Sequence, residues 1–362
     1  MNFYLRSAVS AFLGFAAVSV GAPSFAAAAE NGEIRIMTQN MGDGADLTQL
    51  LSAQSPGAFV AGVTTIYQNI LATKPAERAA RIAREIARER PDVVGLQEAS
   101  ILRTGAVAPA TTVKSDLLQS LQDELEKQGE HYRIAAIVPG FDAEAPSTLG
   151  FDVRLTSQDA ILVRREHLVS NVRISNNQVQ RYLAGLSVPT ALGVTFTIPR
   201  GWASIDLTVD GKTMRFVTTH LEIFPNVSLP QMKELLASAV GDSTLPVVLS
   251  GDFNARADSV MDPTYPTYKA GIDAGFTDAW VKARMADPGF TCCQNPSLNN
   301  ATTSLNKRID LVLLRGINSV SDVQLIGNKP IDKTPSGLWP SDHAGLVMNL
   351  RIPGGGNHEA RR

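Results

Sequence analysis

The sequence contains very few cysteines. Only Cys292 and Cys293 occur in 362 residues, and they are neighbours in the chain. A zinc site needs ligands spaced along the chain, and an ordinary disulfide joins residues that are distant in sequence. The pair therefore argues against a disulfide scaffold and a cysteine metal site. Two states remain open, a vicinal disulfide, which we favour, or two thiols, and we assign no catalytic role to either.

The chain also lacks a dominant charge and has few aromatic residues. Lysine and arginine number 33 against 35 aspartates and glutamates, and aromatic residues make up 6% of the chain. This balance argues against a protein that is held to nucleic acid mainly by a basic surface, although a local basic groove is still allowed. Apolar residues make up 44% and charged residues 19%, which is typical of a globular protein with a substantial core.

Long hydrophobic runs are missing except near the N-terminus. The run from Ala8 to Val20 follows Arg6 and precedes small residues ending at Ala26. This pattern predicts a secretory signal peptide over residues 1–26, with an uncut N-terminal anchor as the alternative. The run is too short to span a bilayer, so we expect a secreted or periplasmic protein without a membrane span.

The rest of the chain alternates strand and helix patterns, which favours an α/β fold in a single domain over residues 32–353. Residues 354–362 are glycine-rich and predict a disordered tail. We predict strands at 33–38, 92–96, 131–138, 159–164, 202–209, 213–219, 246–249, 309–314, 323–326 and 345–352. We predict helices at 77–90, 113–128 and 228–240; residues 42–61 show no clear period, and residues 166–200 contain at least one strand.

Two local patterns are more specific. Asp210-Gly211 lies between two strand patterns and predicts a tight hairpin turn. In the helix at 77–90, glutamates are interleaved with the arginines, which favours a solvated face over a nucleic-acid patch.

Polar residues follow the apolar strand at 246–249, where the chain reads Gly251-Asp252-Phe253-Asn254. On an extended backbone, Asp252 and Asn254 would share one face. A carboxylate there can accept a proton or hold a cation, while an amide donates hydrogen bonds to a phosphate oxygen.

Similar polar groups stand at the ends of other predicted strands: Asn40, Gln97-Glu98, His220, Asp310 and Ser341-Asp342-His343. Together they supply what phosphodiester hydrolysis requires, namely oxygen ligands for Mg²⁺, amides for the phosphate, an acid that orients water and imidazoles that move protons.

In this order, Gln-Asn, Leu-Gln-Glu, Thr-His-Leu-Glu, Gly-Asp-Phe-Asn, Arg-Ile-Asp and Ser-Asp-His resemble the endonuclease/exonuclease/phosphatase superfamily, from Ile34 to about Ile352. The superfamily includes DNases, abasic-site endonucleases, sphingomyelinases and inositol polyphosphate phosphatases. The resemblance implies a DNase I-like four-layer sandwich, in which two packed mixed β-sheets are flanked by helices and the site lies along one edge.

The resemblance also implies roles for individual residues. Glu98 would be the principal Mg²⁺ ligand, with Mn²⁺ or Ca²⁺ as alternatives, and Asn40 and Asp342 would lie beside the metal. Asp252 would position the attacking water. His343, oriented by Asp310, would act as general base or transition-state donor.

The remaining roles concern the phosphate. Asn254, Asn40 and His220 would bind it, with Asp159 as the expected orienting partner of His220. The abasic-endonuclease branch places an acid two residues after the Asn40 position. Here Gly42 occupies that position and Asp43 follows, which puts a second metal ligand in doubt.

The substrate is less specified than the reaction. A nuclease is our first expectation, and a phospholipid phosphodiesterase of the sphingomyelinase kind or an inositol-phosphate phosphatase are the alternatives. A non-catalytic binding relative is a further alternative. Lys307 and Arg308 precede a site strand and could contact a phosphate, while Arg308 could instead pair with Asp310. We expect a monomer whose partner is its phosphodiester substrate, a nucleic acid or a phospholipid headgroup.

Overall fold

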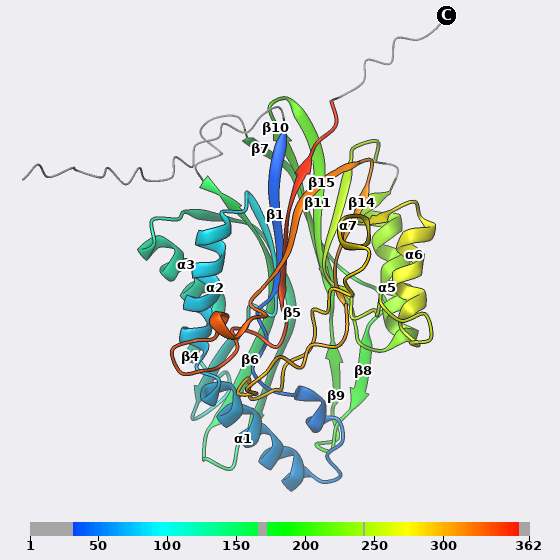
Figure 1. Cartoon of the computed structure of the whole chain (residues 1–362). Helices are drawn as coiled ribbons and strands as arrows, with labels where there is room; N and C mark the ends of the chain where they lie inside the picture. Colours follow the sequence, from blue (N-terminus) through cyan, green and yellow to red (C-terminus); the bar gives the residue numbers. More distant parts are fainter. Residues whose placement is uncertain (1–31, 166–171, 242, 355–362) are drawn as a thin grey trace, which may run out of the picture. The chain divides into compact units, whose positions relative to one another are not determined.

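The computed structural model describes residues 32–165, 172–241 and 243–354. The predicted signal peptide lies outside these residues, as does the predicted tail from residue 355 onward. Two β-sheets dominate the described part of the chain (Figure 1).

The first sheet is mixed. Among the described strands, β1 and β2 run parallel in it and the remaining neighbours are antiparallel. Its strands are, in spatial order, β15 (Ser319–Ile326), β16 (Gly345–Arg351), β1 (Glu33–Asn40), β2 (Val93–Gln97), β6 (Asp152–Arg164), β3 (Ile101–Gly105) and β4 (Thr112–Asp116), with β5 (Tyr132–Pro146) also paired to β6.

The second sheet is also mixed, with β11 and β12 as its parallel pair. Its order is β13 (Thr277–Asp278), β14 (Asp310–Arg315), β12 (Val247–Asp252), β11 (Lys212–His220), β10 (Gly201–Val209) and β7 (Val172–Arg181). Asp210 and Gly211 join β10 to β11, both with positive φ, as the type I′ hairpin turn requires. A separate hairpin consists of β8 (Leu186–Pro189) and β9 (Thr195–Ile198).

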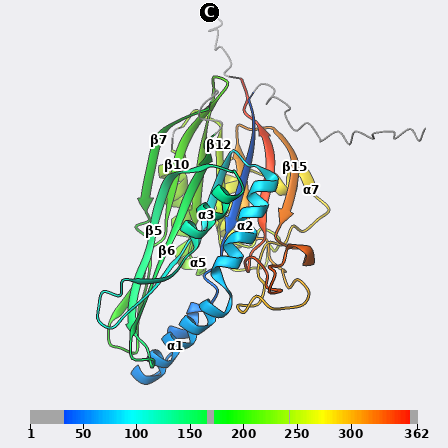
Figure 2. The same ribbon diagram turned by 90° about the vertical axis from the view of Figure 1, so that its left-hand side faces the viewer.

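The two sheets pack face to face through a core to which both contribute, for example Ile36 and Ile161 from one sheet and Phe216 and Val312 from the other. Helices α2 (Pro75–Glu89) and α3 (Leu117–Lys127) cover the outer face of the first sheet. Helices α5 (Pro225–Leu235) and α6 (Tyr265–Asp273) cover the second. Figures 1 and 2 show these helices outside the strands, which confirms the expected four-layer sandwich.

Several elements differ from the prediction. Residues 42–61 are not wholly irregular, because they contain a short 3₁₀ helix η1 (Leu47–Leu50) and the start of α1 (Pro56–Ala72). Helix α1 begins where the Ser55 side chain accepts a hydrogen bond from the Ala58 N–H, with Pro56 at the first helical position. Proline there was a start signal, and Phe59, Val63, Ile66 and Ile70 recur at helical spacing as the buried face, so the sequence carried a signal for α1 that the prediction missed.

Other boundaries moved, and further elements were not predicted. The helix predicted from residue 113 begins at Leu117, because Asp116 caps it and β4 occupies the preceding residues. Helix α6 and the short α7 (Ala279–Arg284) were not predicted. The mixed region 166–200 holds β7, β8 and β9 in its described part, and a π-helical turn, η2 (Leu236–Val240), extends α5.

The interpretation of the α2 arginines and glutamates as one solvated face was wrong in part. Arg84 and Arg88 are exposed, but Arg78 and Glu85 are fully buried. Arg81 is largely buried and pairs with Asp332 at 2.9 Å. The cause is that the segment after β15 covers this flank of the helix, a contact that helical periodicity does not report.

Among the described residues, no helix has the length and apolar character needed to cross a membrane.

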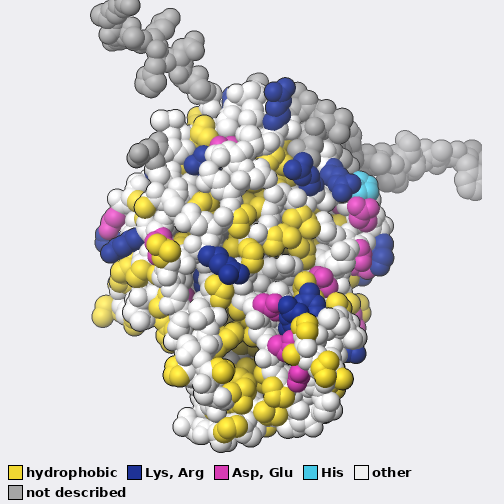
Figure 3. Space-filling view, turned by 180° about the vertical axis from the view of Figure 1, so that it is seen from behind, with side chains coloured by type: hydrophobic (Ala, Val, Ile, Leu, Met, Phe, Trp, Pro, Cys, Tyr) yellow, Lys and Arg dark blue, Asp and Glu magenta, His cyan; other side chains and the backbone are white. Residues whose placement is uncertain are grey.

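Hydrophobic side chains gather over the lower part of the face seen in Figure 3.

Candidate active site

Strand pairing brings the polar strand ends together. Because β1 and β2 are parallel, Asn40 lies opposite Gln97 at their shared carboxyl end. In the second sheet, His220 lies opposite Asp252, which in turn pairs with Asp310 of the antiparallel β14. The Asn40 Nδ2 donates a hydrogen bond to Asp252 Oδ2 at 3.1 Å, so one contact links the two sheets at this edge.

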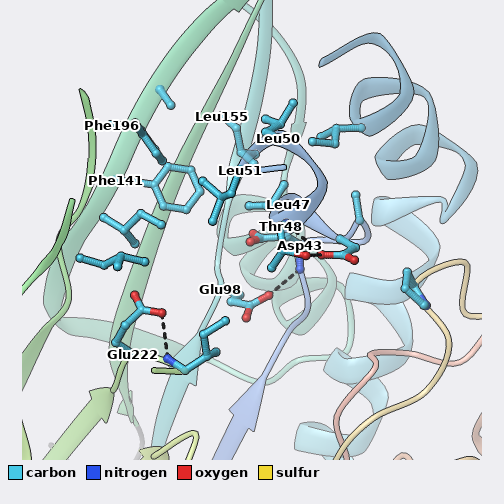
Figure 4. Close-up of a pocket in the computed structure, with 18 of the residues that line it drawn as sticks. Asp43, Leu47, Thr48, Leu50, Leu51, Glu98, Phe141, Leu155, Phe196 and Glu222 are labelled. Carbon is cyan, nitrogen blue, oxygen red and sulfur yellow. Dashed lines mark hydrogen bonds between the residues drawn. The ribbon is translucent and has the colours of Figure 1, made fainter. Parts of the chain in front are cut away.

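Glu98 is the carboxylate at the end of β2. It has a positive φ of 54°, and its two oxygens accept hydrogen bonds from Asn40 Nδ2 at 3.0 Å and from the Asp43 N–H at 2.7 Å. Figure 4 shows the Asp43 contact. Burial raises the pKa of Glu98, but the positive charges of His220 and His343 and the Asn40 hydrogen bond outweigh it and lower the pKa overall. Glu98 is therefore held as a carboxylate.

Asn40 has little freedom to bind a phosphate through its nitrogen. Its Nδ2 donates to both Glu98 and Asp252, which uses the two hydrogens of the amide. Its Oδ1 accepts a hydrogen bond from the Gly42 N–H at 2.9 Å and keeps one lone pair. Of the two roles expected for Asn40, the geometry favours the one beside a cation.

His343 and Asp310 form the closest charged pair of the site. His343 Nδ1 lies 2.8 Å from Asp310 Oδ2, and His343 Nε2 lies 3.9 Å from Asp252 Oδ2. Burial lowers the pKa of His343, but the Asp310 carboxylate, with smaller contributions from Asp252 and Asp342, raises it well above the usual value. The imidazole is therefore held in its protonated form, with Nε2–H directed toward the Asp252 side.

His220 is oriented by an arginine that the sequence did not point to. Arg200 Nη1 lies 2.9 Å from His220 Nδ1, whereas Asp159 Oδ1 lies 3.8 Å away. Burial and the Arg200 charge lower the pKa of His220, but the Asp159 and Asp252 carboxylates outweigh them and raise it overall, which favours the charged ring. A guanidinium can only donate, so the Arg200 contact by itself favours an accepting Nδ1 and a proton on Nε2. That nitrogen lies 3.6 Å from Asp252 Oδ2 and 4.0 Å from Glu98 Oε1.

Asp159, the expected partner of His220, is nearer to Glu98. Its Oδ1 accepts a hydrogen bond from the Glu98 N–H at 3.2 Å. Arg200, and not Asp159, is therefore the residue nearest to His220 Nδ1. Asp159 instead fixes the backbone of Glu98, the residue expected to bind metal.

Asn254 does not share an extended face with Asp252, as the sequence pattern had suggested. The strand ends at Asp252, and Asn254 has a positive φ of 48°. The two residues still touch, because the Asn254 N–H donates to Asp252 Oδ1 at 2.8 Å. Asn254 Nδ2 donates to the Leu221 carbonyl at 2.9 Å, which leaves its second N–H for a ligand.

Asp43 and Asp342 add two more acids. Burial and the Glu98 charge raise the pKa of Asp43 to about 8, and its Oδ1 is buried without a hydrogen-bond partner. Burial also raises the pKa of Asp342. At Gly42, with φ of 71°, a Cβ atom would lie 2.4 Å from Asp342 Oδ1. The glycine is needed there, because any side chain at that position would collide with Asp342.

This donor set fits a divalent cation. Ligand atoms of Glu98, His220 and Asp252 all lie within 4.8 Å of one another. The carboxylates of Asp43 and Asp342 and the free lone pair of Asn40 Oδ1 add hard oxygen donors, which Mg²⁺, Mn²⁺ and Ca²⁺ accept. An orphaned buried carboxylate oxygen beside like charges is the arrangement that a bound cation would relieve.

Two further expectations concern the loop that precedes β14. Cys292 and Cys293 are joined as a vicinal disulfide, and the Cys292 backbone pairs with His343 and Lys307. Arg308 pairs with neither Asp310 nor a phosphate position, because its buried guanidinium bonds Asp278 and the Ala257 carbonyl. The expected pairing of Arg308 with Asp310 is therefore wrong, and its burial against Asp278 argues against a phosphate contact.

Arg78 was also missed as a residue of this region. Its buried guanidinium donates to the carbonyls of Met41, Gly42 and Pro340 at 2.6, 3.0 and 3.2 Å, so it holds the loop after β1 to the loop before β16. A signal was present, because Arg78 has the same helical spacing as the apolar residues Ala79, Ile82 and Ile86. Arg200 had no comparable signal, since it lies in a loop between β9 and β10.

A cavity of about 590 Å³ adjoins these groups. Glu98, His220, Asp252, Asn254 and His343 line one part of it. Figure 4 shows apolar side chains, among them Phe141, Leu155 and Leu50, on the side away from Glu98.

Comparisons with known proteins agree with this architecture. A protein of the endonuclease/exonuclease/phosphatase family from Leptotrichia buccalis C-1013-b has a TM-score of 0.53 and 18% identity, with 88% of this chain and 99% of that chain covered. A protein of the same family from Beutenbergia cavernae DSM 12333 has a TM-score of 0.52 and 20% identity, with coverage of 90% and 72%.

The D. rerio TDP2 in complex with a single-strand DNA product has a TM-score of 0.50 and 19% identity, with coverage of 88% and 99%. At these identities the likeness concerns the fold. The comparison with curated proteins yields no match. The model of the Endonuclease/Exonuclease/phosphatase family matches residues 66–343, well over half of the sequence. The chain therefore belongs to the Endonuclease/Exonuclease/phosphatase family, whose members hydrolyse phosphoester bonds.

Proposed function

We propose that this protein is a metal-dependent phosphodiesterase that uses Mg²⁺ and an attacking water. The observation that carries the proposal is the Asn40 to Asp252 contact between the two sheets, around which the other charged groups gather. They are Glu98, His220, Asp310, Asp342 and His343. A surface that only bound a partner would not need this many buried charges, because each is costly to desolvate.

Glu98, Asp342 and the Asn40 Oδ1 would hold the cation, with Asp43 as a further oxygen donor. When bound, the cation would neutralise charge on the phosphate and lower the pKa of water. The acidic residues support this assignment, because burial raises the pKa of both Asp43 and Asp342, and a cation would favour their charged forms.

Asp252 is the residue that we assign to the attacking water. Burial and the neighbouring Asp310 charge raise its pKa, which brings a carboxylate closer to the basicity that proton transfer requires. The Asn254 N–H and Asn40 Nδ2 hold its two oxygens in place. Asp252 would orient the water and accept its proton.

The imidazoles would act on the phosphate. His343, protonated through its pairing with Asp310, would donate Nε2–H to an oxygen on which charge develops. His220 Nε2–H and the second N–H of Asn254 would donate from the other side. Arg200 Nη1 lies 2.9 Å from His220 Nδ1 and orients the ring.

A nuclease is a more specific candidate within this reaction class. The D. rerio TDP2 with a bound single-strand DNA product supports it by analogy of fold. Four phenylalanines, Phe59, Phe141, Phe196 and Phe224, line the cavity and could stack on a base.

We further propose that the protein is exported as a monomer after removal of residues 1–26. The support is the sequence pattern at the N-terminus. Mass spectrometry of protein recovered from outside the cytoplasm would give a mass starting near residue 27. A full-length mass in the membrane fraction would point to an uncut anchor. Light scattering of the purified protein would report the monomer mass.

The reaction is tested with purified protein and four substrates: bis-p-nitrophenyl phosphate, plasmid DNA, sphingomyelin and an inositol phosphate. We expect Mg²⁺-dependent turnover of at least the first, abolished by EDTA and restored by added metal. Turnover that survives EDTA would refute the metal assignment. If none of the four substrates is turned over with Mg²⁺, Mn²⁺ or Ca²⁺, a non-catalytic binding protein is favoured.

A further inference from the structure

The cavity beside the charged groups has two unlike parts. One part is the charged edge described above. The other is enclosed by η1, by α1, by the hairpin end of β5 and β6, and by the β8–β9 hairpin. Its walls are aliphatic and phenyl groups, for example Leu50, Phe59, Phe141, Leu155, Leu186 and Phe196. Phe141 and Phe196 meet edge to face at 5.9 Å, so these rings already pack on each other.

The cavity contains almost nothing that would attract a polyanion. Arg200 is its only lysine or arginine among the described residues, and its guanidinium is engaged by His220 at 2.9 Å and by Glu222 at 3.5 Å. Asp46 and Glu144 line it beyond the charged edge. A nucleic-acid strand needs cationic contacts to its successive phosphates. This lining would accommodate one phosphate and repel the next.

Aliphatic walls also cannot read the edges of a base. On entering the cavity, the hydrogen-bond donors and acceptors of a base would give up their bonds to water and find no protein partners, which is unfavourable. A hydrocarbon group loses no hydrogen bonds there and gains about 25 cal/mol for each Å² of apolar surface that is buried. The cavity volume of about 590 Å³ lies within the range of sites that enclose small molecules.

We propose that the cavity holds the hydrocarbon part of an amphiphilic phosphodiester, whose single phosphate lies between Glu98, Asp252 and His343. This rests on the proposed phosphodiesterase function and specifies its substrate class. The hydrocarbon enters past Leu192, Val194 and Phe224, which are 36%, 59% and 38% exposed and line the same cavity.

The test uses alkyl p-nitrophenyl phosphates with methyl, butyl and octyl groups, each below the concentration at which it aggregates. Every buried methylene should raise kcat/KM about fourfold until the cavity is filled. The octyl ester should thus exceed the methyl ester by at least about a hundredfold, even if only about half of its seven additional methylenes are buried. A nucleoside ester, thymidine 5′-p-nitrophenyl phosphate, is the competing arm.

Variants in the cavity wall separate this effect from general activity. Leu186→Gln, on the partly exposed β8, should reduce kcat/KM for the octyl ester about tenfold and leave the methyl ester unchanged. Ala143→Trp should fill part of the cavity, so that kcat/KM stops rising at a shorter alkyl chain than in the parent protein. The matched controls are Leu71→Gln and Ala106→Trp, at exposed positions outside the cavity, and they should behave as the parent protein.

Binding gives a readout that does not depend on turnover. Octylphosphonate should bind the Asp252→Asn protein in calorimetry, more tightly than methylphosphonate by about the same factor as the kcat/KM ratio. If the methyl ester is hydrolysed but chain length has no effect, the cavity inference is wrong and the phosphodiesterase proposal stands. If the thymidine ester exceeds the octyl ester, the substrate is a nucleic acid. If no ester is hydrolysed while octylphosphonate still binds selectively, the reaction proposal fails and the cavity inference survives.

Discussion

At the scale of single residues, Asp252 is a carboxylate that the fold keeps among other charges. It lies in contact with Asn40 and Asn254, and burial and Asp310 raise its pKa. Such a residue contributes to reactivity at some expense of stability, because buried like charges repel each other.

We therefore predict that Asp252→Asn lowers kcat on bis-p-nitrophenyl phosphate by about 10²–10⁴, the usual range for loss of a positioned general base. The melting temperature should stay the same or rise, because the repulsion from Asp310 is removed. Asp273→Asn, at the exposed end of α6, is the matched control and should change neither quantity. If the variant keeps more than a tenth of the parent activity, Asp252 does not take part in the reaction.

Glu85 has a raised pKa for which the proposed chemistry gives no reason. Its side chain is fully buried on α2, its oxygens have no hydrogen-bond partner, and Arg81 lies 3.7 Å away. Burial raises its pKa from 4.5 to about 8, although the Arg81 charge opposes the shift. The folded protein therefore holds a proton there that the unfolded chain loses above pH 4.5.

Stability should consequently fall as pH rises from about 4.5 to about 8, by up to roughly 4 kcal/mol from this group. Glu85→Gln should remove that fall. We expect the variant to match the parent near pH 4.5 and to be more stable at pH 8, as measured by urea unfolding at both values. Glu126→Gln, at an exposed position on α3, is the control for loss of one charge. Parallel curves for parent and Glu85→Gln would show that Glu85 is ionised throughout.

At the scale of elements, α2 does more than cover a sheet. Through Arg78 it binds three backbone carbonyls in the two loops that carry Asp43 and Asp342. The helix thereby sets the spacing between two acids that come from segments about 300 residues apart.

Arg78→Met should leave those carbonyls buried without donors and cost about 3–5 kcal/mol in the free energy of unfolding. It should also raise the Mg²⁺ concentration needed for half-maximal activity, while kcat at saturating metal falls less. Arg84→Met, on the exposed face of the same helix, should change stability by no more than about 0.5 kcal/mol. An unchanged metal requirement in a folded Arg78→Met protein would contradict the positioning role.

At the scale of the whole molecule, the site joins two sheets that also pack through an apolar core and through the Gln97–Thr218 hydrogen bond. Contacts between Asn40 of β1 and Asp252 of β12 cross from one sheet to the other. A cation bound here would therefore stabilise the packing of both halves, because the complete ligand set exists only in the folded state.

We predict that Mg²⁺ at about one hundred times its dissociation constant raises the free energy of unfolding by about 2.7 kcal/mol. The melting temperature should rise by several degrees and return on addition of EDTA. Glu98→Gln should lose most of this shift, and Glu126→Gln should keep it. A melting temperature that is insensitive to Mg²⁺, Mn²⁺ and Ca²⁺ would contradict the metal site.

Many helices, strands and turns of this molecule could be predicted from local sequence patterns. The Asp210-Gly211 turn, the helical spacing in α2 and the apolar strands predicted their elements, because turns, stripes and alternation depend on residues close in sequence. The order of six motifs predicted the family and its four-layer fold.

The tertiary structure decided the rest. The choice of Arg200 over Asp159 beside His220, the burial of Glu85 and the apolar cavity next to the charged edge all depend on contacts between distant segments. No local period reports such contacts, because the pairing of β1 with β2 and of β11 with β12 sets which strand ends meet. The sequence by itself thus determined the reaction class that we propose, and only the folded chain supplied the cavity from which we infer its substrate.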